Sequence, residues 1–186
     1  MTAVQRLLTT PFPEALDLES NASLHREQFG DQEFGQRMLT ASRLLEIGVP
    51  YVEVQLDGWD THIDNDRQTQ QLCQRLEQPW LAMIDRLQTQ HLWDDTLLLW
   101  MGEFGRTPRL NGQAGRDHFP ETIPVVLGGG HLGSKVIGGT SDDGSARVGT
   151  QHSVADLMAT ILTLMGVDVS QTYRTDFGSP TTVTDD

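Results

Sequence analysis

One stretch of the sequence gathers side chains that could do chemistry. The run GEFGRTPRLNGQAGRDHFP lies between two apolar segments and contains Glu103, Arg106, Arg116, Asp117 and His118. Carboxylates and imidazoles are the ligands that divalent cations take from proteins. Guanidinium groups bind the oxygens of anions such as phosphate and sulfate. The stretch therefore predicts a site for a metal ion and an anion.

A second stretch, DGWDTHIDND, follows another apolar segment and supplies Asp60 and His62. Because one residue separates these two, an extended backbone points both side chains to the same side. Asp117 and His118 are adjacent, so in a loop both reach one centre, or each serves one of two neighbouring ions. The predicted metal ligands are Asp60, His62, Glu103, Asp117 and His118. The predicted ion is divalent (Zn²⁺, Ca²⁺, Mg²⁺ or Mn²⁺), and the sequence does not choose among these.

Each candidate also has a plainer interpretation. Asp60 can cap the turn that follows it, and His62 can be an exposed turn residue. A charge at the end of a buried strand is costly without a partner, so Glu103 can form a salt bridge with Arg106. Arg106 and Arg116 either hold carboxylates in place or neutralise the anionic oxygens of a substrate, which makes them the predicted catalytic residues. A salt-bridge network without any ligand therefore stays open.

Apolar periodicity predicts the elements that position these loops. The predicted helices span residues 31–47, 66–90 and 153–165, and the predicted strands span 50–56, 96–101 and 122–130. Gly48 caps the first helix, Pro79 kinks or breaks the second, and Ser153 with Asp156 forms a capping box for the third. The continuous apolar run at 96–101 is typical of a strand that is covered on both faces.

This order of helices and strands predicts the fold class α/β, with a largely parallel sheet. In open parallel sheets, ligands bind outside the carboxyl ends of the strands. The two stretches with the candidate ligands follow the strands predicted at 50–56 and 96–101. We therefore expect the two sets of ligands to meet at one edge of the sheet.

The chain is strongly acidic. It has 13 Lys and Arg against 26 Asp and Glu, and its net charge is −13 over 186 residues. That charge argues against nucleic acid or an anionic membrane as a partner, although solubility alone explains it equally well. No apolar run approaches the roughly 18 residues of a membrane helix, and the first residues lack the apolar centre of a signal peptide. Taken alone, the chain is expected to be cytoplasmic.

The sequence predicts one domain with polar ends. A polar N-terminal segment covers residues 1–30, the domain covers 31–178, and a flexible tail covers 179–186. A chain of this length is long enough to bury a core. The lone Cys73 cannot form an intramolecular disulfide and is expected to be an inert thiol.

Three motifs carry a resemblance to a known family. The stretches GVPYVEVQLDGWDTHIDN, LWDDTLLLWMGEFGRTPRLNGQAGRDHFP and DLMATILTLMGVD occur in this order between Phe29 and Asp168. They resemble the C-terminal half of a bacterial family, the domain of unknown function family 1501, which is grouped with sulfatases in the alkaline phosphatase superfamily. Asp60 and His62 fall on the WDTH motif of that family, which makes them plausible ligands.

The resemblance implies an alkaline phosphatase-like α/β/α sandwich whose relatives hydrolyse phosphate or sulfate monoesters with one or two divalent metals. An anionic small-molecule or carbohydrate ester is then the expected substrate. By position, Glu103 takes the place of a metal-binding acid, while Phe104 stands where an imidazole is often found. Asp117 and His118 could supply the missing ligands.

The resemblance also implies that a part is missing. Family members normally begin with a strand and a Gly-rich, acid-containing loop that brings the first metal ligand and the nucleophile, and residues 1–48 do not match it. A truncated hydrolase-like domain with little turnover is therefore expected, and a homo-oligomer could form through the exposed sheet edge. An export signal would have been in the missing part. The alternative is a non-catalytic binding or assembly module with at most a structural metal.

Overall fold

The structure is a computed structural model that describes residues 9–19, 22–178 and 180–182. The chain divides into two compact units. Unit 1 comprises residues 1–93 and 110–117, and unit 2 comprises residues 94–109 and 118–186. No helix among the described residues is long and apolar enough to cross a membrane.

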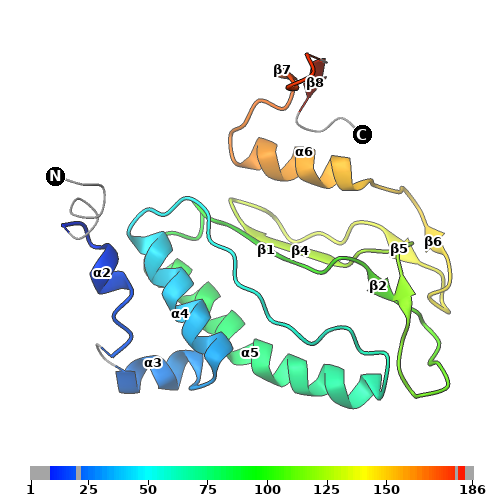
Figure 1. Ribbon diagram of the computed structural model, residues 1–186, viewed down its shortest axis with the longest axis horizontal. Coiled ribbons are helices and arrows are strands. Elements are labelled where there is room, and N and C mark those ends of the chain that lie inside the picture. The colour runs from blue at the N-terminus through cyan, green and yellow to red at the C-terminus, as the bar shows by residue number, and fades with distance from the viewer. Residues whose placement is uncertain (1–8, 20–21, 179, 183–186) are drawn as a thin grey trace. The chain divides into compact units, whose positions relative to one another are not determined.

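Unit 1 is built from helices (Figure 1). Its described helices are α2 (Phe12–Ala15), α3 (Ala22–Phe29), α4 (Glu33–Glu46) and α5 (Asn65–Thr89). Helix α4 packs against α5, and α3 packs against both. The core between them consists of buried apolar side chains: Phe29, Phe34, Met38, Leu39, Ala41, Leu72, Leu76, Met83 and Leu87.

Helix α4 confirms the first predicted helix and its cap. Gly48 has a φ of +87°, a conformation that glycine adopts without strain. The backbone N–H of Gly48 donates to the carbonyl of Leu45 at 2.9 Å, and that of Val49 donates to the carbonyl of Leu44 at 3.0 Å. These hydrogen bonds satisfy carbonyls that the end of a helix otherwise leaves unpaired, so the helix ends where its sequence signal predicts.

Helix α5 confirms the second predicted helix but contains no break. The helix is continuous through Pro79, which is buried. A proline inside a helix costs about 3 kcal/mol because it removes one backbone hydrogen bond and crowds the preceding turn. Leu76 and Met83 are buried on either side of Pro79. Packing of this apolar face against the other helices therefore outweighs the local cost.

Unit 2 contains helix α6 (Val154–Leu164) and short antiparallel strand pairs. The pairs are β1 (Leu97–Met101) with β4 (Val125–Gly129), β2 (Gly105–Arg106) with β3 (His118–Phe119), β5 (Gly139–Thr140) with β6 (Arg147–Val148), and β7 (Thr172–Arg174) with β8 (Pro180–Thr182). Three predicted elements are confirmed as β1, β4 and α6. The capping box at Ser153 and Asp156 is present as predicted.

The predicted α/β/α sandwich with a largely parallel sheet is wrong. Each sheet among the described residues has two antiparallel strands. A parallel pair needs a long crossover, usually a helix, and the chain between β1 and β4 instead forms the β2–β3 hairpin. Strand β1 is also exposed at Leu99, Trp100 and Met101, so the prediction that both of its faces are covered is wrong as well.

The strand predicted at residues 50–56 is also wrong. Its side chains do alternate: Val52 and Val54 are half-buried, while Glu53 and Gln55 are exposed. The segment nevertheless belongs to none of the strand ladders of the described chain. Alternation makes a segment suitable for one face of a sheet, but a strand also needs a partner for its backbone groups. Of the tail predicted at 179–186, residues 179 and 183–186 lie outside the described residues.

Candidate metal centre

Within unit 1, the chain just before α5 lies beside the loop of residues 110–117. The backbone N–H of Asn65 donates to the carbonyl of Ala114 at 2.9 Å. The backbone N–H of Arg116 donates to the carbonyl of Thr61 at 3.0 Å. Two stretches about fifty residues apart in the sequence are thereby held together by backbone groups, without any need for a ligand.

The side chain of Asn111 forms hydrogen bonds both within the loop and to the segment before α5. Its Nδ2 donates to the carbonyl of His62 and to Oδ1 of Asp117, both at 3.0 Å. Its Oδ1 accepts the backbone N–H groups of Gln113 at 2.9 Å and Gly115 at 3.0 Å. One amide group therefore closes the turn and fixes the positions of two predicted ligands relative to each other.

A buried polar chain lies beneath this loop. Thr61 is 1% exposed, and its Oγ1 accepts Nδ2 of the buried Asn65 at 2.6 Å. Oδ1 of Asn65 in turn accepts Nε of Arg116 at 3.0 Å. Buried polar groups are costly when unpaired, so this chain rigidifies the segment that carries Asp60 and His62. Arg116, predicted as a catalytic residue, uses one of its donors here to hold the loop.

The loop approaches the segment so closely that only glycine fits at position 115. A Cβ atom at Gly115 would overlap the backbone carbonyl of His62 and the backbone nitrogen of Ile63. Gly115 is buried, and Ile63 forms an isolated bridge with Ala114 alongside it. Any larger residue would therefore push His62 away from the loop.

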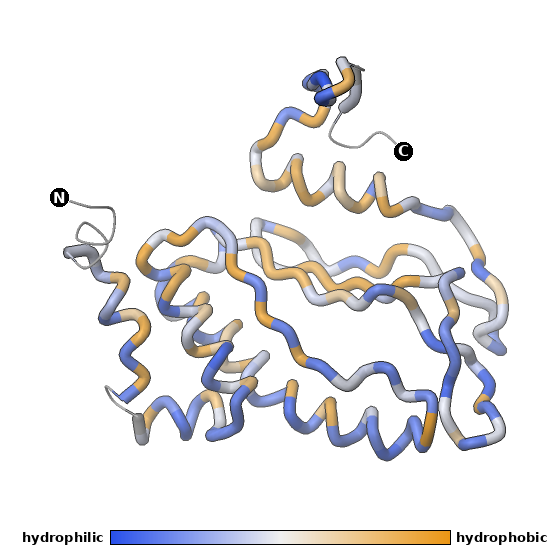
Figure 2. The backbone as a smooth tube through the Cα atoms, in the orientation of Figure 1, coloured by the Kyte–Doolittle hydropathy of each residue, from blue (hydrophilic) through white to orange (hydrophobic). Residues whose placement is uncertain are grey.

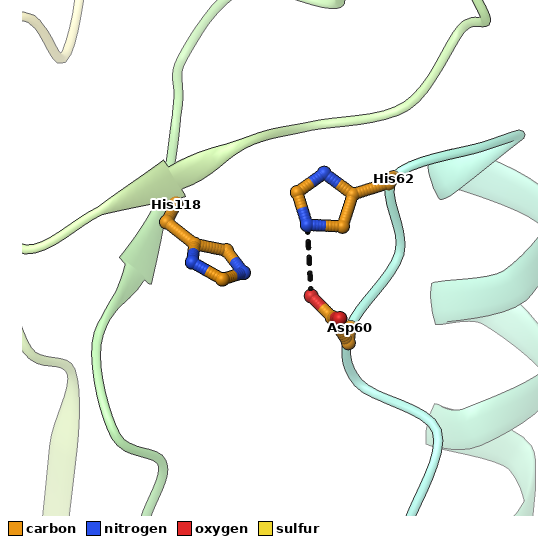
Figure 3. Close-up of side chains that lie close together, drawn as sticks. All are labelled: Asp60, His62 and His118. Atoms are coloured by element: carbon orange, nitrogen blue, oxygen red, sulfur yellow. Dashed lines mark ion pairs between the residues drawn. The ribbon is translucent and has the colours of Figure 1, made fainter.

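His62 lies between two carboxylates. Its Nδ1 is 3.0 Å from Oδ1 of Asp117, and its Nε2 is 3.1 Å from Oδ1 of Asp60 (Figure 3 draws the second pair). The side chains of Asp60, His62 and Asp117 are 64%, 42% and 55% exposed, so an ion can reach them from solvent. Three predicted ligands, which come from both sequence stretches, thus meet in unit 1.

Another predicted ligand, His118, directly follows Asp117 in the sequence. The loop of unit 1 ends at Asp117, so His118 belongs to unit 2. Among the described residues, Asp60, His62 and His118 supply a candidate metal-binding triad of side chains (Figure 3). One carboxylate and two imidazoles are a donor set that suits a borderline cation such as Zn²⁺.

Comparison with known protein families gives a match over the whole chain. A family described as protein of unknown function (DUF1501) matches residues 1–186. The chain belongs to the DUF1501 family. The resemblance to that family is thereby confirmed. Neither curated proteins nor solved structures provide a match. Membership of DUF1501 assigns no activity, and the link to sulfatases stays a prediction.

The remaining predicted residues of this DUF1501 member lie in unit 2. Glu103 is exposed, between β1 and β2, and stays a prediction as a ligand. Arg106 is in β2, directly opposite His118 in β3. Its Cζ lies 5.8 Å from the centre of the Phe104 ring, and the rings of Phe104 and His118 are 4.3 Å apart, centre to centre.

Several contacts that support the candidate site were not predicted from the sequence. Thr61, Asn65 and Asn111 form its hydrogen-bond framework, and Phe104 contacts the imidazole of His118. Asn111 is followed by glycine, and an Asn-Gly pair marks a turn, which is the one signal that could have found it. Neutral polar residues such as Thr61 otherwise give no sign of being buried.

Proposed function

We propose that the chain binds a divalent cation through the carboxylate of Asp60 and Nε2 of His62. His118 is the third protein ligand in this proposal. The observation that carries it is the position of His62, whose two ring nitrogens each lie within 3.1 Å of a carboxylate. A carboxylate beside an exposed imidazole nitrogen offers two donors to an ion that arrives from solvent.

In this proposal Asp117 is a hydrogen-bond partner of His62, whereas the sequence predicted it to be a metal ligand. Its Oδ1 faces Nδ1 of His62 and also accepts Nδ2 of Asn111. Histidines that bind metals usually donate their other ring N–H to a carboxylate, which fixes the ring and raises its basicity. Asp117 therefore orients His62, while Nε2 of His62 faces the cation.

The donor set restricts the choice of ion. Ca²⁺ and Mg²⁺ prefer oxygen ligands, whereas imidazole suits Zn²⁺ and the later transition metals. With two imidazoles among three protein ligands, Zn²⁺ fits better than Ca²⁺ or Mg²⁺. Mn²⁺, which accepts carboxylate and water readily, is the next candidate.

The cation would serve hydrolysis of a phosphate or sulfate monoester. Protein-bound divalent ions polarise the ester and stabilise the charge that develops on the transferred group. A water oxygen forms the new bond to phosphorus or sulfur, the bond to the alcohol oxygen breaks, and that oxygen takes up a proton. The substrate is an anionic small-molecule or carbohydrate ester, and a guanidinium group neutralises its non-bridging oxygens.

A purely structural ion is the second candidate. It is favoured by the hydrogen bonds between the loop of residues 110–117 and the segment before α5. A cation bound to Nε2 of His62 would strengthen the hydrogen bond between Nδ1 of His62 and Asp117 of that loop, whether or not the ion touches a substrate. In this case metal binding stabilises the fold, and no ester is hydrolysed.

Metal-dependent thermal unfolding tests the proposal. Zn²⁺ or Mn²⁺ at about 100 times its dissociation constant should stabilise the wild type by about 2.7 kcal/mol. Asp60→Asn and His62→Gln should lose this stabilisation. Asp57→Asn is the matched control, because Asp57 is an exposed carboxylate in the same stretch. Equal stabilisation of all four proteins would exclude the site.

Hydrolysis of a chromogenic phosphate or sulfate ester separates the two candidates. Release of the chromophore by the metal-loaded wild type, reduced at least about tenfold by Asp60→Asn, supports the hydrolase, since loss of one ligand or its support typically costs 10–100-fold. Metal-dependent stabilisation without any turnover supports the structural ion.

A further inference from the structure

We propose that Phe104 is a positioning residue, whose ring orients the imidazole of His118 and the guanidinium of Arg106 for joint use. The inference rests on the proposed role of His118 as a metal ligand. It adds that Arg106 is the guanidinium that meets the tetrahedral oxyanion of the ester.

The β2–β3 pair brings Arg106 and His118 together. The two residues are directly opposite each other in an antiparallel pair, so their side chains project from the same face. Each of these strands is only two residues long. Strands this short fix the backbone positions but leave long side chains with considerable rotamer freedom.

The ring of Phe104 limits that freedom for both side chains. Its centre is 4.3 Å from that of the His118 ring, with an angle of 44° between the ring planes. The guanidinium carbon of Arg106 is 5.8 Å from the same ring centre. Tilted aromatic pairs and cations near an aromatic face are both favourable arrangements, because the face of the ring carries partial negative charge.

The backbone next to Phe104 is itself fixed. Gly105 is buried, and its N–H donates to the carbonyl of Thr122 at 2.6 Å. A Cβ atom at Gly105 would be only 2.6 Å from Oγ1 of Thr122. The peptide that carries Phe104 therefore has little room to move, which limits the positions from which its ring can meet the two polar groups.

Two features distinguish this role from that of an ordinary core phenylalanine. Phe104 is half-exposed, and it is not among the buried apolar side chains of the described residues. Its aromatic and cation contacts are with an imidazole and a guanidinium. The geometry points to a ring that pre-organises ligands, and catalytic and metal sites depend on such supporting contacts.

Cobalt substitution tests this role. The visible absorption of bound Co²⁺ depends on the number and geometry of its ligands, so it responds to a displaced imidazole. In the full chain, Phe104→Leu should weaken Co²⁺ binding by about 10-fold or more and change the spectrum, as loss of supporting contacts does. Phe104→Tyr, which keeps the aromatic face, should retain both.

Inorganic phosphate provides the second readout. Its affinity for the Co²⁺-loaded protein should fall in Arg106→Gln and also in Phe104→Leu, with Phe104→Tyr close to wild type. Phe119→Leu is the matched control, because Phe119 is the half-buried aromatic of the same hairpin and lies opposite Gly105. It should change neither phosphate affinity nor the spectrum.

The outcomes separate this inference from the proposed function. If the wild type binds no Co²⁺, the proposed function fails and the inference fails with it. If the wild type binds Co²⁺ and Phe104→Leu binds it with the same affinity and spectrum, the inference alone is wrong. Should Phe104→Leu fail to fold, as judged by circular dichroism, Phe104→Met replaces it, since methionine fills similar space without an aromatic face.

Discussion

The two units of the molecule bury their apolar side chains very differently. In unit 1, helices α3, α4 and α5 enclose a core in which Leu39 and Leu87 are 0% and 1% exposed. In unit 2, Ile161 is the one buried apolar side chain among the described residues. The apolar colouring of β1, β4 and α6 in Figure 2 belongs largely to side chains that are half-buried or exposed.

The difference follows from how each kind of element satisfies its backbone. A helix completes its hydrogen bonds internally, so it needs a partner for only one face, and α4 and α5 provide each other with one. A two-stranded sheet leaves one edge of each strand and both of its faces uncovered, and alone it is marginally stable in water. Stability is therefore expected to reside mainly in unit 1.

The candidate metal centre shows the same contrast. Asp60 and His62 belong to the segment just before α5. In this segment, the side chains of Thr61 and Asn65 are hydrogen-bonded to each other. His118 and Arg106 stand on strands of two residues each. The candidate ligands of unit 1 are therefore held by several hydrogen bonds, whereas the imidazole of His118 lies against the ring of Phe104.

We expect the largest difference in the free energy of unfolding when a leucine is replaced by alanine in each of the two units. Leu87→Ala, at a position that is 1% exposed, should lower the free energy of unfolding by about 2–5 kcal/mol. Leu99→Ala, in β1 at a position that is 37% exposed, should cost less than about 1.5 kcal/mol, because less apolar surface is lost. Urea denaturation followed by circular dichroism measures both. Equal losses would contradict the uneven distribution of stability.

The second prediction concerns the close approach at Gly115. Gly115→Ala should weaken metal binding by about 10–100-fold, because the new Cβ displaces the backbone of His62 and hence its ring. Gly112→Ala is the control, since a Cβ there meets nothing within 4 Å. Isothermal titration with Zn²⁺ compares the two variants. Wild-type affinity in Gly115→Ala would show that the loop does not position His62.

A smaller effect is expected at the start of α6. Oγ of Ser153 accepts the backbone N–H of Asp156 at 3.1 Å, and the backbone N–H of Ser153 donates to Oδ2 of Asp156 at 2.7 Å. The backbone N–H of Ser153, and then its hydroxyl, donate to the Asp156 carboxylate and hold its pKa below the ordinary value. Ser153→Ala should cost about 1 kcal/mol of helix stability. Thr163→Ala, at an exposed position of the same helix, is the control.

Because this cap acts only at the start of α6, its loss is best measured by hydrogen exchange of individual backbone amides. Amides of α6 should exchange faster in Ser153→Ala, while those of α4 and α5 keep their wild-type protection. Equal loss of protection in all three helices would mean that the two units unfold together, which would contradict a difference in stability between them.

The smallest expected effect is a pH dependence within unit 1. His25 is buried, and Nη2 of Arg43 lies 3.1 Å from its Nδ1. Burial, then the charge of Arg43 and that of Arg86, lowers the pKa of His25 below 6.5, and Glu46 opposes this only in part. The unfolded chain therefore binds this proton more readily than the folded chain does. Stability should be greatest above pH 6.5 and fall as the pH drops below it.

His25→Gln tests the origin of this dependence, because glutamine keeps a polar group without a proton to bind. The free energy of unfolding of the wild type should decrease more between pH 8 and pH 5 than that of the variant. Identical pH profiles would show that other groups dominate. His91→Gln, at an exposed position outside this contact, should behave like the wild type.

The helices could be predicted from the sequence because their signals are local. Apolar spacing in α4 and α5, the glycine at Gly48 and the capping box at Ser153 all act within a few residues. The sheet could not be predicted, because strand pairing depends on partners that are distant in sequence. Residues 50–56 have the alternation of a strand and yet no ladder, and β1 pairs antiparallel with β4.

The candidate site shows the same division. Residue type alone identifies Asp60, His62 and Asp117 as candidate ligands. Their proximity was predicted, although the fold expected to bring them together was wrong. The framework of Thr61 and Asn111 could not be predicted, because a neutral polar residue becomes structural only when its partners are known. Charge and residue type therefore predicted which candidate side chains lie close together, whereas the supporting hydrogen bonds emerge only from the structure.

Anomalous diffraction from crystals grown with Zn²⁺ would locate a bound ion and its protein ligands. One strong zinc peak is expected within about 2.0–2.2 Å of both Nε2 of His62 and a carboxylate oxygen of Asp60. The hydrogen bond from Nδ1 of His62 to Asp117 should remain in place. A map without a peak at these atoms, with the imidazole still between its two carboxylates, would contradict the proposal that this cluster is a metal centre.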